Sequence, residues 1–338
     1  MILVTGGTGL LGAHLMYELV NDKKKVRAII RPSSNLDQVR KTFSYYTDNS
    51  EELFAAIEWV EADITDPVAL TEAMKEVQQV YHTAAFVSFD PKDHAEMLRI
   101  NIESTTNIVN RCLEKNDVQC CFVSSTAALG ASVYGEEVTE DRLWTDLKRR
   151  SVYSISKFKS EMEIWRGITE GLQAVIINPS VIIGPGNWQR SSSRLFSTVW
   201  KGLNYYTKGG TGYVDVRDVV KSMIMVMNGK HWGERFIVSG ENLTYKSVFN
   251  MIARSLQKSS PGKLATPFLA GLAWRLDWLK SMLTGKERVI TKETAQAGQK
   301  LTQFSNHKII SATGIQFIPI EQSIRETAKL FLSEQAKA

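Results

Sequence analysis

Tyr153 and Lys157 are a pair of side chains whose spacing could support acid–base chemistry. They stand four residues apart, so on a helix they share one face. A tyrosine ordinarily titrates near pH ~10, and its use as an acid or base at neutral pH requires about three pKa units, or ~4 kcal/mol, of help. A lysine ammonium one turn away interacts favourably with the phenolate. The same spacing also arises by chance on amphipathic helices, so a third group has to support the assignment.

That third group is provided by a strand-like run that ends in hydroxyl side chains, Phe122-Val123-Ser124-Ser125-Thr126. A carbonyl that is being reduced needs a second hydrogen-bond donor at its oxygen, and Ser125 is placed to provide it. Ser124 and Thr126 are competing candidates, because spacing alone does not determine which hydroxyl faces the site. Ser125, Tyr153 and Lys157 together predict catalysis at a carbonyl or alcohol oxygen.

A glycine-rich turn lies between the first expected strand, Ile2–Thr5, and the first expected helix, Leu10–Asn21. Its glycines fit both G-x-G-x-x-G and a three-residue glycine spacing. Such a turn lets a pyrophosphate approach bare backbone, while the helix N-terminus supplies free N–H groups and a positive dipole. Its position at the first strand–helix junction predicts a dinucleotide site. The residues expected to bind the cofactor here are Gly6, Thr8, Gly9, Leu10 and Gly12.

The end of the second expected strand, Val26–Ile30, bears on the choice of dinucleotide. An acid at this place would hold the ribose 2′-hydroxyl of NAD. The chain instead has Arg31, followed by Pro32, Ser33 and Ser34. A guanidinium and hydroxyls can bind a 2′-phosphate, which a carboxylate would repel. This favours NADP(H) over NAD(H), the alternative being that Arg31 stacks on the adenine and accepts either cofactor.

Other strand ends offer groups for the nucleotide and for a substrate. Asp63 and Ile64 follow the third strand, where a short acid could accept from the adenine amino group or simply form a turn. After His82 come Thr83, Ala84 and Ala85, whose small side chains would let a cofactor lie close. The segments Phe86–Phe89, Ala131–Tyr134 and Asn187–Trp188 could line a substrate pocket or form local core. The substrate candidates are Phe86, Ser88, Thr126 and Asn187.

The elements that position these residues alternate between strand and helix through the first 180 residues. Further strands are expected at Ile57–Val60, Gln79–Thr83, Gln119–Ser124 and Gln173–Asn178, and a helix at Pro67–Val77 behind the N-cap Asp66. Continuous apolar strands separated by helices predict a parallel sheet covered on both faces. From Gly184 onward, loops rich in Gly, Ser and Asn replace this alternation.

We therefore expect an α/β protein with a Rossmann-type doubly wound parallel sheet and a smaller C-terminal lobe. The dinucleotide-binding domain should comprise residues 1–183, and residues 213–240 should return to it, with strands within Tyr213–Val220 and Arg235–Val238. Residues 184–212 and 241–338 should form the substrate-binding lobe. Trp274, Trp278 and Leu279 recur at helical spacing and are expected to belong to the core of that lobe.

Composition excludes several classes of protein. The 338 residues are 43% apolar, which is too many for a disordered chain, and the 22 Gly and 8 Pro are too few for collagen. The net charge of +5 is spread out, and the runs Lys23–Lys25 and Lys148–Arg150 are short, so no nucleic-acid partner is expected. Three cysteines, two of them adjacent, and five scattered histidines predict neither a disulfide framework nor a metal site. Without a signal segment or a sufficiently long apolar run, a cytoplasmic protein without a membrane partner is expected.

Together these motifs resemble the extended short-chain dehydrogenase/reductases, the superfamily of NAD-dependent epimerases and dehydratases. The likeness includes Asn101 and the segment Asn178-Pro179-Ser180-Val181, which is similar to the one that holds the nicotinamide. The resemblance implies that Tyr153 is the proton donor, that Lys157 binds the nicotinamide ribose and that Ser125 binds the substrate oxygen. Further cofactor contacts are implied for Asn101, Ser124, Tyr153, Lys157, Pro179 and Val181.

Two departures narrow the subgroup that the chain resembles. Asn178-Pro179 stands where sugar-nucleotide enzymes usually have Arg-Pro, and Val214–Asp218 looks more like the dihydroflavonol-reductase-like and hydroxysteroid-dehydrogenase-like branch. Thr126, Ala127 and Ala128 replace the acid pair of dehydratases. Reduction of a carbonyl, or oxidation of a secondary alcohol, in a small and mostly apolar metabolite is therefore favoured. A nucleotide-sugar epimerase or dehydratase with tightly bound NAD and a non-catalytic redox sensor are the alternatives. The helices near Asn101 and Tyr153 resemble those of a family dimer interface, which implies a homodimer.

Overall fold

The structure is a computed structural model. It describes residues 1–88, 90–115, 117–130, 132, 135–144, 150–269, 271, 274–275, 277 and 298–336. Among the residues named above, Phe89, Ala131, Val133, Tyr134, Lys148, Arg149, Trp278 and Leu279 lie outside these ranges. Across the ranges that are described, no helix has the length and apolar character needed to cross a membrane.

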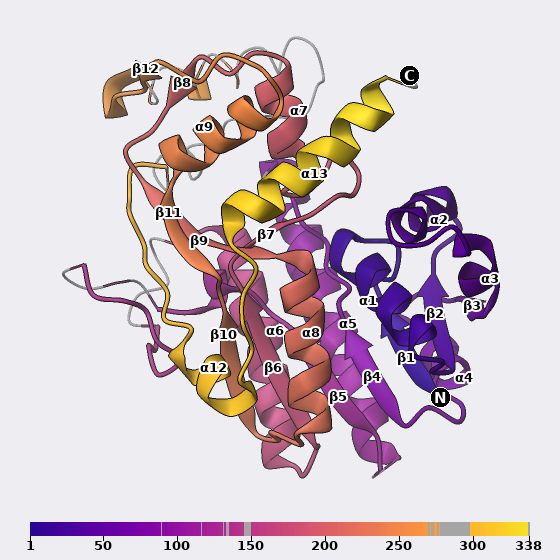
Figure 1. The fold of residues 1–338 in the computed structure, drawn as a ribbon. Helices are drawn as coiled ribbons and strands as arrows, with labels where there is room; N and C mark the ends of the chain where they lie inside the picture. Colours follow the sequence, from indigo (N-terminus) through magenta and orange to yellow (C-terminus); the bar gives the residue numbers. More distant parts are fainter. Residues whose placement is uncertain are drawn as a thin grey trace.

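A parallel sheet forms the centre of the molecule and confirms the expected Rossmann-type architecture (Figure 1). Within the described residues it has seven strands in the order β10-β6-β5-β4-β1-β2-β3, and each neighbouring pair is parallel. The strands are β1 (Ile2–Thr5), β2 (Val26–Ile30), β3 (Ile57–Glu61), β4 (Gln79–His82), β5 (Gln119–Val123), β6 (Ala174–Pro179) and β10 (Glu234–Val238). The apolar runs recognised in the sequence are thus strands of this sheet, and because all of them are parallel their carboxyl ends meet at one edge.

Helices cover both faces of this sheet (Figure 1). On one face lie α1 (Leu10–Asn21), α2 (Leu36–Ser44), α3 (Ser50–Ala55), α8 (Val216–Asn228) and α12 (His307–Thr313). On the other lie α4 (Pro67–Ala73), α5 (His94–Glu114) and α6 (Val152–Thr169). The adjacent cysteines show the alternation of a strand, because Cys120 packs into one core and Cys121 into the other. Both are free and buried.

A second, smaller group of elements packs around its own apolar core. A three-stranded sheet has the order β11-β9-β7, and β12 pairs with β8. These elements are β7 (Val181–Ile183), β8 (Tyr205–Tyr206), β9 (Gly210–Asp215), β11 (Glu241–Thr244), β12 (Lys263–Leu264), α7 (Arg194–Trp200), α9 (Tyr245–Ser255) and α13 (Ile320–Gln335). Two 3-10 turns, η1 (Pro91–Asp93) and η2 (Thr126–Ala128), complete the described elements. The chain passes from the main sheet to the small one at Ser180, between β6 and β7.

Two sequence expectations about these elements are wrong in detail. Residues 213–220 do not form a strand of the main sheet: β9 ends at Asp215 and pairs with β7 and β11, and α8 follows. The carboxylate of Asp215 caps α8 by accepting from the backbone N–H of Arg217 at 2.8 Å, which starts a helix where a strand was expected. Helix α4 is capped by Asp66 as expected but ends at Ala73, because the chain turns through a positive φ of 60° at Glu76.

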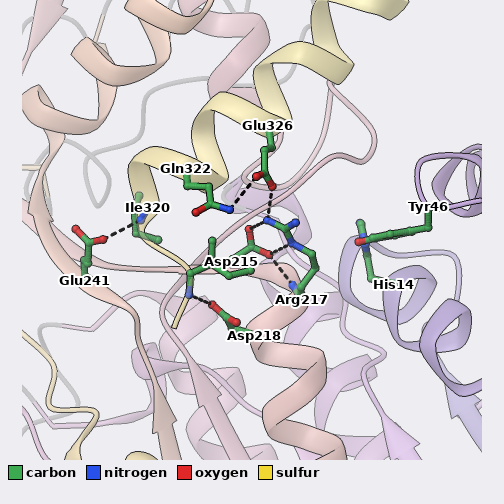
Figure 2. A network of polar contacts seen from close by, with 10 residues as sticks. His14, Tyr46, Asp215, Arg217, Asp218, Glu241, Ile320, Gln322 and Glu326 are labelled. Atoms are coloured by element: carbon green, nitrogen blue, oxygen red, sulfur yellow. Dashed lines mark hydrogen bonds and ion pairs between the residues drawn. The ribbon is translucent and has the colours of Figure 1, made fainter. Parts of the chain in front are cut away.

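Polar contacts join α13 to the end of β9 and the start of α8 (Figure 2). The Arg217 guanidinium lies between the carboxylates of Asp215 and Glu326, at 2.7 and 2.8 Å. Just before the helix, the Asp218 carboxylate accepts from the backbone N–H of Ile318 at 2.7 Å. These contacts join the start of α8 to the C-terminal helix.

The Asp218 carboxylate predicts a pH dependence of stability. Burial raises the pKa of Asp218 to about 6, while the hydrogen bond from Ile318 opposes this rise. Because the folded-state pKa exceeds the unfolded value near ~3.9, the folded protein gains stability from this group at low pH and loses it as pH rises toward 6. We expect Asp218→Asn to remove this loss. The Tm of the variant minus the Tm of wild type should therefore be roughly 2–5 °C larger at pH 7.5 than at pH 4.5. Thermal denaturation at both pH values checks this, and a constant Tm difference would contradict it.

Candidate active site

Ser125 and Tyr153 meet where β5 ends and α6 begins. Ser125 is the N-cap of η2, where its hydroxyl oxygen accepts from the Ala127 N–H at 3.1 Å. Tyr153 lies in the first turn of α6, which Ser151 caps by accepting from the Ser154 N–H at 3.1 Å. Burial raises the pKa of Tyr153, and a hydrogen bond from the Ser125 side chain opposes that rise. A tyrosine that keeps its proton at neutral pH suits a proton donor better than a base.

Lys157 lies one turn further along the same helix and is almost fully buried. Its Nζ donates to the backbone carbonyl of Val123 at 2.9 Å, which places the ammonium at the carboxyl end of β5. Burial lowers the pKa of Lys157 to about 8, and the carboxylate of Glu161 counteracts the fall. The lysine is therefore close to its titration range at neutral pH and sits beside the residues expected to react.

The three candidate hydroxyl residues Ser124, Ser125 and Thr126 have different surroundings. Ser124 donates to a carboxylate oxygen of Glu161 at 2.6 Å, in a buried contact two turns further along α6 than Tyr153. Ser125 contacts Tyr153. Thr126 is partly buried at the start of η2. Ser124 and Ser125 thus bind different residues of α6, which the spacing left open.

Bare backbone forms a cradle at the glycine turn. Gly6 has a φ of +73°, and a Cβ there would lie 2.6 Å from the N atom of Ala84. A Cβ on Gly12 would lie 2.3 Å from the Gly6 carbonyl oxygen. Gly9 is the N-cap of α1 without a side-chain cap, so the first N–H groups of this helix keep capacity for an anion. The residues present fit a dinucleotide pyrophosphate.

The loop after β4 lies directly beside this cradle. The Thr83 hydroxyl donates to the Thr5 carbonyl at 2.7 Å, and Ala84 and Ala85 follow next to the glycine turn. His82 is buried between the hydroxyls of Thr5, 2.7 Å from its Nδ1, and Thr105, 3.2 Å from its Nε2. Burial lowers the pKa of His82 to about 3, so this ring is neutral and part of the support beneath the site.

Arg31 stands exposed at the end of β2, next to the end of β3. Its backbone N–H donates to the Ser34 hydroxyl at 3.0 Å, which curls the loop around it. Among the described residues its guanidinium has no hydrogen-bond or ion-pair partner. Hydrogen bonds from Thr65 lower the pKa of Asp63, and the positive charge of Arg31 adds to this effect. Arg31 and Asp63 therefore share the edge at which the adenosine end of a dinucleotide would lie.

Several other predicted site residues are bound to protein groups. The Asn101 side-chain amide makes two hydrogen bonds to the backbone of Phe86. It accepts from the N–H at 2.7 Å and donates to the carbonyl at 3.0 Å. The Ser88 hydroxyl donates to Asp93 at 2.7 Å. Asn187 is exposed and accepts from the Gln189 N–H at 2.9 Å. Asn101 thus holds the loop after β4 in place.

The remaining predicted cofactor residues lie along the same edge of the sheet. Ile64 is partly buried after β3, and Pro179 and Val181 flank the crossing at Ser180. Thr8 and Leu10 lie on either side of the α1 N-cap.

Sequence reasoning missed Glu161 and Arg235, which lie directly behind the site. The carboxylate of Glu161 and the guanidinium of Arg235 form a buried ion pair at 2.8 Å. Glu161 follows Lys157 by four residues, so its helical spacing was a usable signal. Nothing in the local sequence around Arg235 indicates its partner.

Residues 2–238 match the family model described as the NAD dependent epimerase/dehydratase family. The chain belongs to this family. The resemblance inferred from the motifs is thereby confirmed, and the protein is an NAD(P)-dependent oxidoreductase of the epimerase/dehydratase family.

Relatives of this family member include reductases. Sterol demethylase protein B of Methylococcus capsulatus is 28% identical over 284 residues, covering 82% of this chain and 81% of that protein. Dihydroflavonol 4-reductase of Arabidopsis thaliana is 24% identical over 261 residues, covering 73% and 67%. The crystal structure of the yeast methylglyoxal/isovaleraldehyde reductase Gre2, complexed with NADPH, has a TM-score of 0.75 at 19% identity and covers 100% of this chain and 99% of its own. At 19% identity, the likeness to Gre2 supports the fold alone.

Proposed function

We propose that this family member uses NADPH to reduce a carbonyl group of a small, mostly apolar metabolite, or catalyses the reverse oxidation of a secondary alcohol. The observation that carries the proposal is the contact between the Ser125 hydroxyl and Tyr153, with Lys157 one turn away. These groups provide a proton donor, an oxygen-binding hydroxyl and a cation at one point of the sheet edge.

The three side chains have separate tasks in the proposed reaction. When bound, the reduced nicotinamide supplies the hydride that the carbonyl carbon receives. Tyr153 transfers its phenolic proton to the carbonyl oxygen, and Ser125 donates a hydrogen bond to the same oxygen. Lys157 stabilises the phenolate that results, and its ammonium has donors left for the nicotinamide ribose beyond the one used on Val123. Thr126, Ala127 and Ala128 form η2 and bring no acid for the proton exchange of a dehydratase.

The proposed function is tested by cofactor titration and substrate screening. The purified protein is titrated with NADPH and NADH, and ketones, aldehydes and secondary alcohols are then screened for an absorbance change at the nicotinamide band. We expect tighter NADPH binding and NADPH-dependent reduction of an apolar carbonyl compound. NAD⁺ released from the denatured protein, together with interconversion of sugar isomers without added cofactor, would identify an epimerase instead.

We also propose that α5 and α6 form the surface of a homodimer. The two helices pack against each other, and Met162 on α6 is 42% exposed. Light scattering at micromolar concentration should give twice the chain mass of 38.0 kDa. Met162→Glu should shift this mass toward the monomer, because a charge would enter the apolar contact. A monomeric wild-type protein would contradict the proposal.

A further inference from the structure

The carboxylate of Glu161 is the centre of a buried polar cluster directly behind the catalytic candidates. Its side chain is 2% exposed. It accepts hydrogen bonds from the Ser124 hydroxyl at 2.6 Å, the Asn178 amide at 2.9 Å and the Arg235 guanidinium at 2.8 Å. A buried carboxylate is costly unless it is paired and hydrogen-bonded, and here both conditions are met.

The donors around Glu161 belong to the strand ends that carry the site. Ser124 directly precedes Ser125 at the end of β5. The Asn178 amide also donates to the backbone carbonyl of Ser125 at 3.0 Å. Asn178 itself lies in β6 immediately before Pro179, where the chain crosses toward the small sheet. One carboxylate on α6 therefore ties down both strand ends, on the helix that also carries Tyr153 and Lys157.

Arg235 anchors this carboxylate from the edge of the sheet. It lies on β10, and its side chain is 13% exposed. Besides the pair with Glu161, its Nε donates to the backbone carbonyl of Glu140 at 2.8 Å. The Glu140 carboxylate in turn accepts from the Ile237 N–H on β10 at 2.8 Å. The guanidinium is thus held on two sides and neutralises the buried carboxylate in a single orientation.

We propose that Glu161, held by Arg235, is a positioning residue for the proposed reduction, setting Ser125 against Tyr153 and keeping a negative charge behind Lys157. The inference rests on the proposed function and adds residues that do not contact substrate or cofactor. A displacement of about 1 Å at a reacting group can cost ~10²-fold in rate. The cluster is therefore expected to act on turnover more than on cofactor affinity.

The charge of Glu161 also acts on Lys157 directly. Lys157 faces the neutral His82 from β4, the carbonyl of Val123 from β5 and the carboxylate of Glu161 on its own helix, where Tyr153 lies one turn earlier. Burial lowers the pKa of Lys157, and Glu161 is the group that raises it again. Removing this carboxylate should lower the pKa of Lys157 further. The decline of reductase activity at alkaline pH should then begin at a lower pH than in wild type.

The test compares Glu161→Gln with the double variant Glu161→Gln/Arg235→Met. The double variant removes both charges, so neither is left buried without a partner. The matched control is Arg27→Met/Glu58→Gln, which removes an ion pair at 2.9 Å between β2 and β3, where Arg27 likewise binds a backbone carbonyl at 2.9 Å. Both Glu161 variants should bind NADPH within about threefold of wild type and lose kcat by about 10–100-fold with a small change in KM. In Glu161→Gln the alkaline limb of kcat should also move to lower pH, and the control should match wild type.

A second readout does not depend on turnover. In protein labelled with ¹³Cε-lysine, the Lys157 resonance is assigned with Lys157→Met and titrated by NMR in wild type and Glu161→Gln. A lower titration midpoint in the variant supports the proposal even if wild-type protein reduces no carbonyl compound, a result that would refute the proposed function alone. The positioning role of Glu161 is overturned by an unchanged titration midpoint of Lys157 in Glu161→Gln. It is also overturned if the double variant has the kcat and pH profile of wild type.

Discussion

Replacing Tyr153 by phenylalanine should lower kcat for carbonyl reduction by about 10²–10⁴-fold. The substitution removes the phenolic proton and leaves the ring, so the packing at the start of α6 is retained. NADPH affinity should remain close to wild type, because the glycine cradle and Arg31 are provided by other elements. Steady-state kinetics on an identified substrate, together with NADPH titration by fluorescence, separates the two effects.

The control for this substitution is Tyr205→Phe. Tyr205 lies on β8 in the smaller group of elements and is 48% exposed. It should keep wild-type kcat and NADPH affinity. Full turnover in Tyr153→Phe would refute the assignment of Tyr153 as proton donor and, with it, the proposed mechanism.

Replacing Arg31 by alanine should weaken NADPH binding by about 10–100-fold and leave NADH binding nearly unchanged. The guanidinium at the end of β2 is exposed and has no ion-pair partner among the described residues, so it is available for a 2′-phosphate. A charge-assisted hydrogen bond contributes about 1.5–3 kcal/mol, which corresponds to this range of affinity. The ratio of the two dissociation constants is the quantity to measure.

Arg325→Ala provides the comparison for Arg31. Arg325 is an exposed arginine on α13, so its removal changes the net charge equally without touching the nucleotide edge. It should leave both dissociation constants unchanged. Equal weakening of NADPH and NADH in Arg31→Ala would show that Arg31 stacks on the adenine, and tighter NADH binding in wild type would refute the preference itself.

Much of the fold could be predicted from the sequence because its signals are local. The strand Ile2–Thr5, the glycine turn and the helix Leu10–Asn21 are where the apolar periodicity places them. The N-cap Asp66 is also where a capping side chain followed by proline indicates it. The family follows from the same short motifs and is borne out over residues 2–238.

Predictions failed or stayed open where a residue has two locally acceptable environments. The run from Tyr213 suits a strand, yet Asp215 caps a helix there. The cofactor contact expected of Asn101 stays a prediction, while its amide binds the backbone of Phe86, a partner that its own helix does not reveal. In each case the deciding hydrogen bond depends on the course of the chain around the residue.

The sequence by itself determined the types of chemistry: a hydroxyl, a phenol and an ammonium, a backbone cradle for phosphates, and a cation where NAD enzymes place an acid. These follow from residue type and near spacing, which strand and helix periodicity convert into shared faces. Only the tertiary structure decided that Ser125 meets Tyr153 while Ser124 meets Glu161. It alone also brought Arg235 to Glu161, across 74 positions of sequence. The order of strands in the sheet sets such pairings, and that order arises from packing the whole chain.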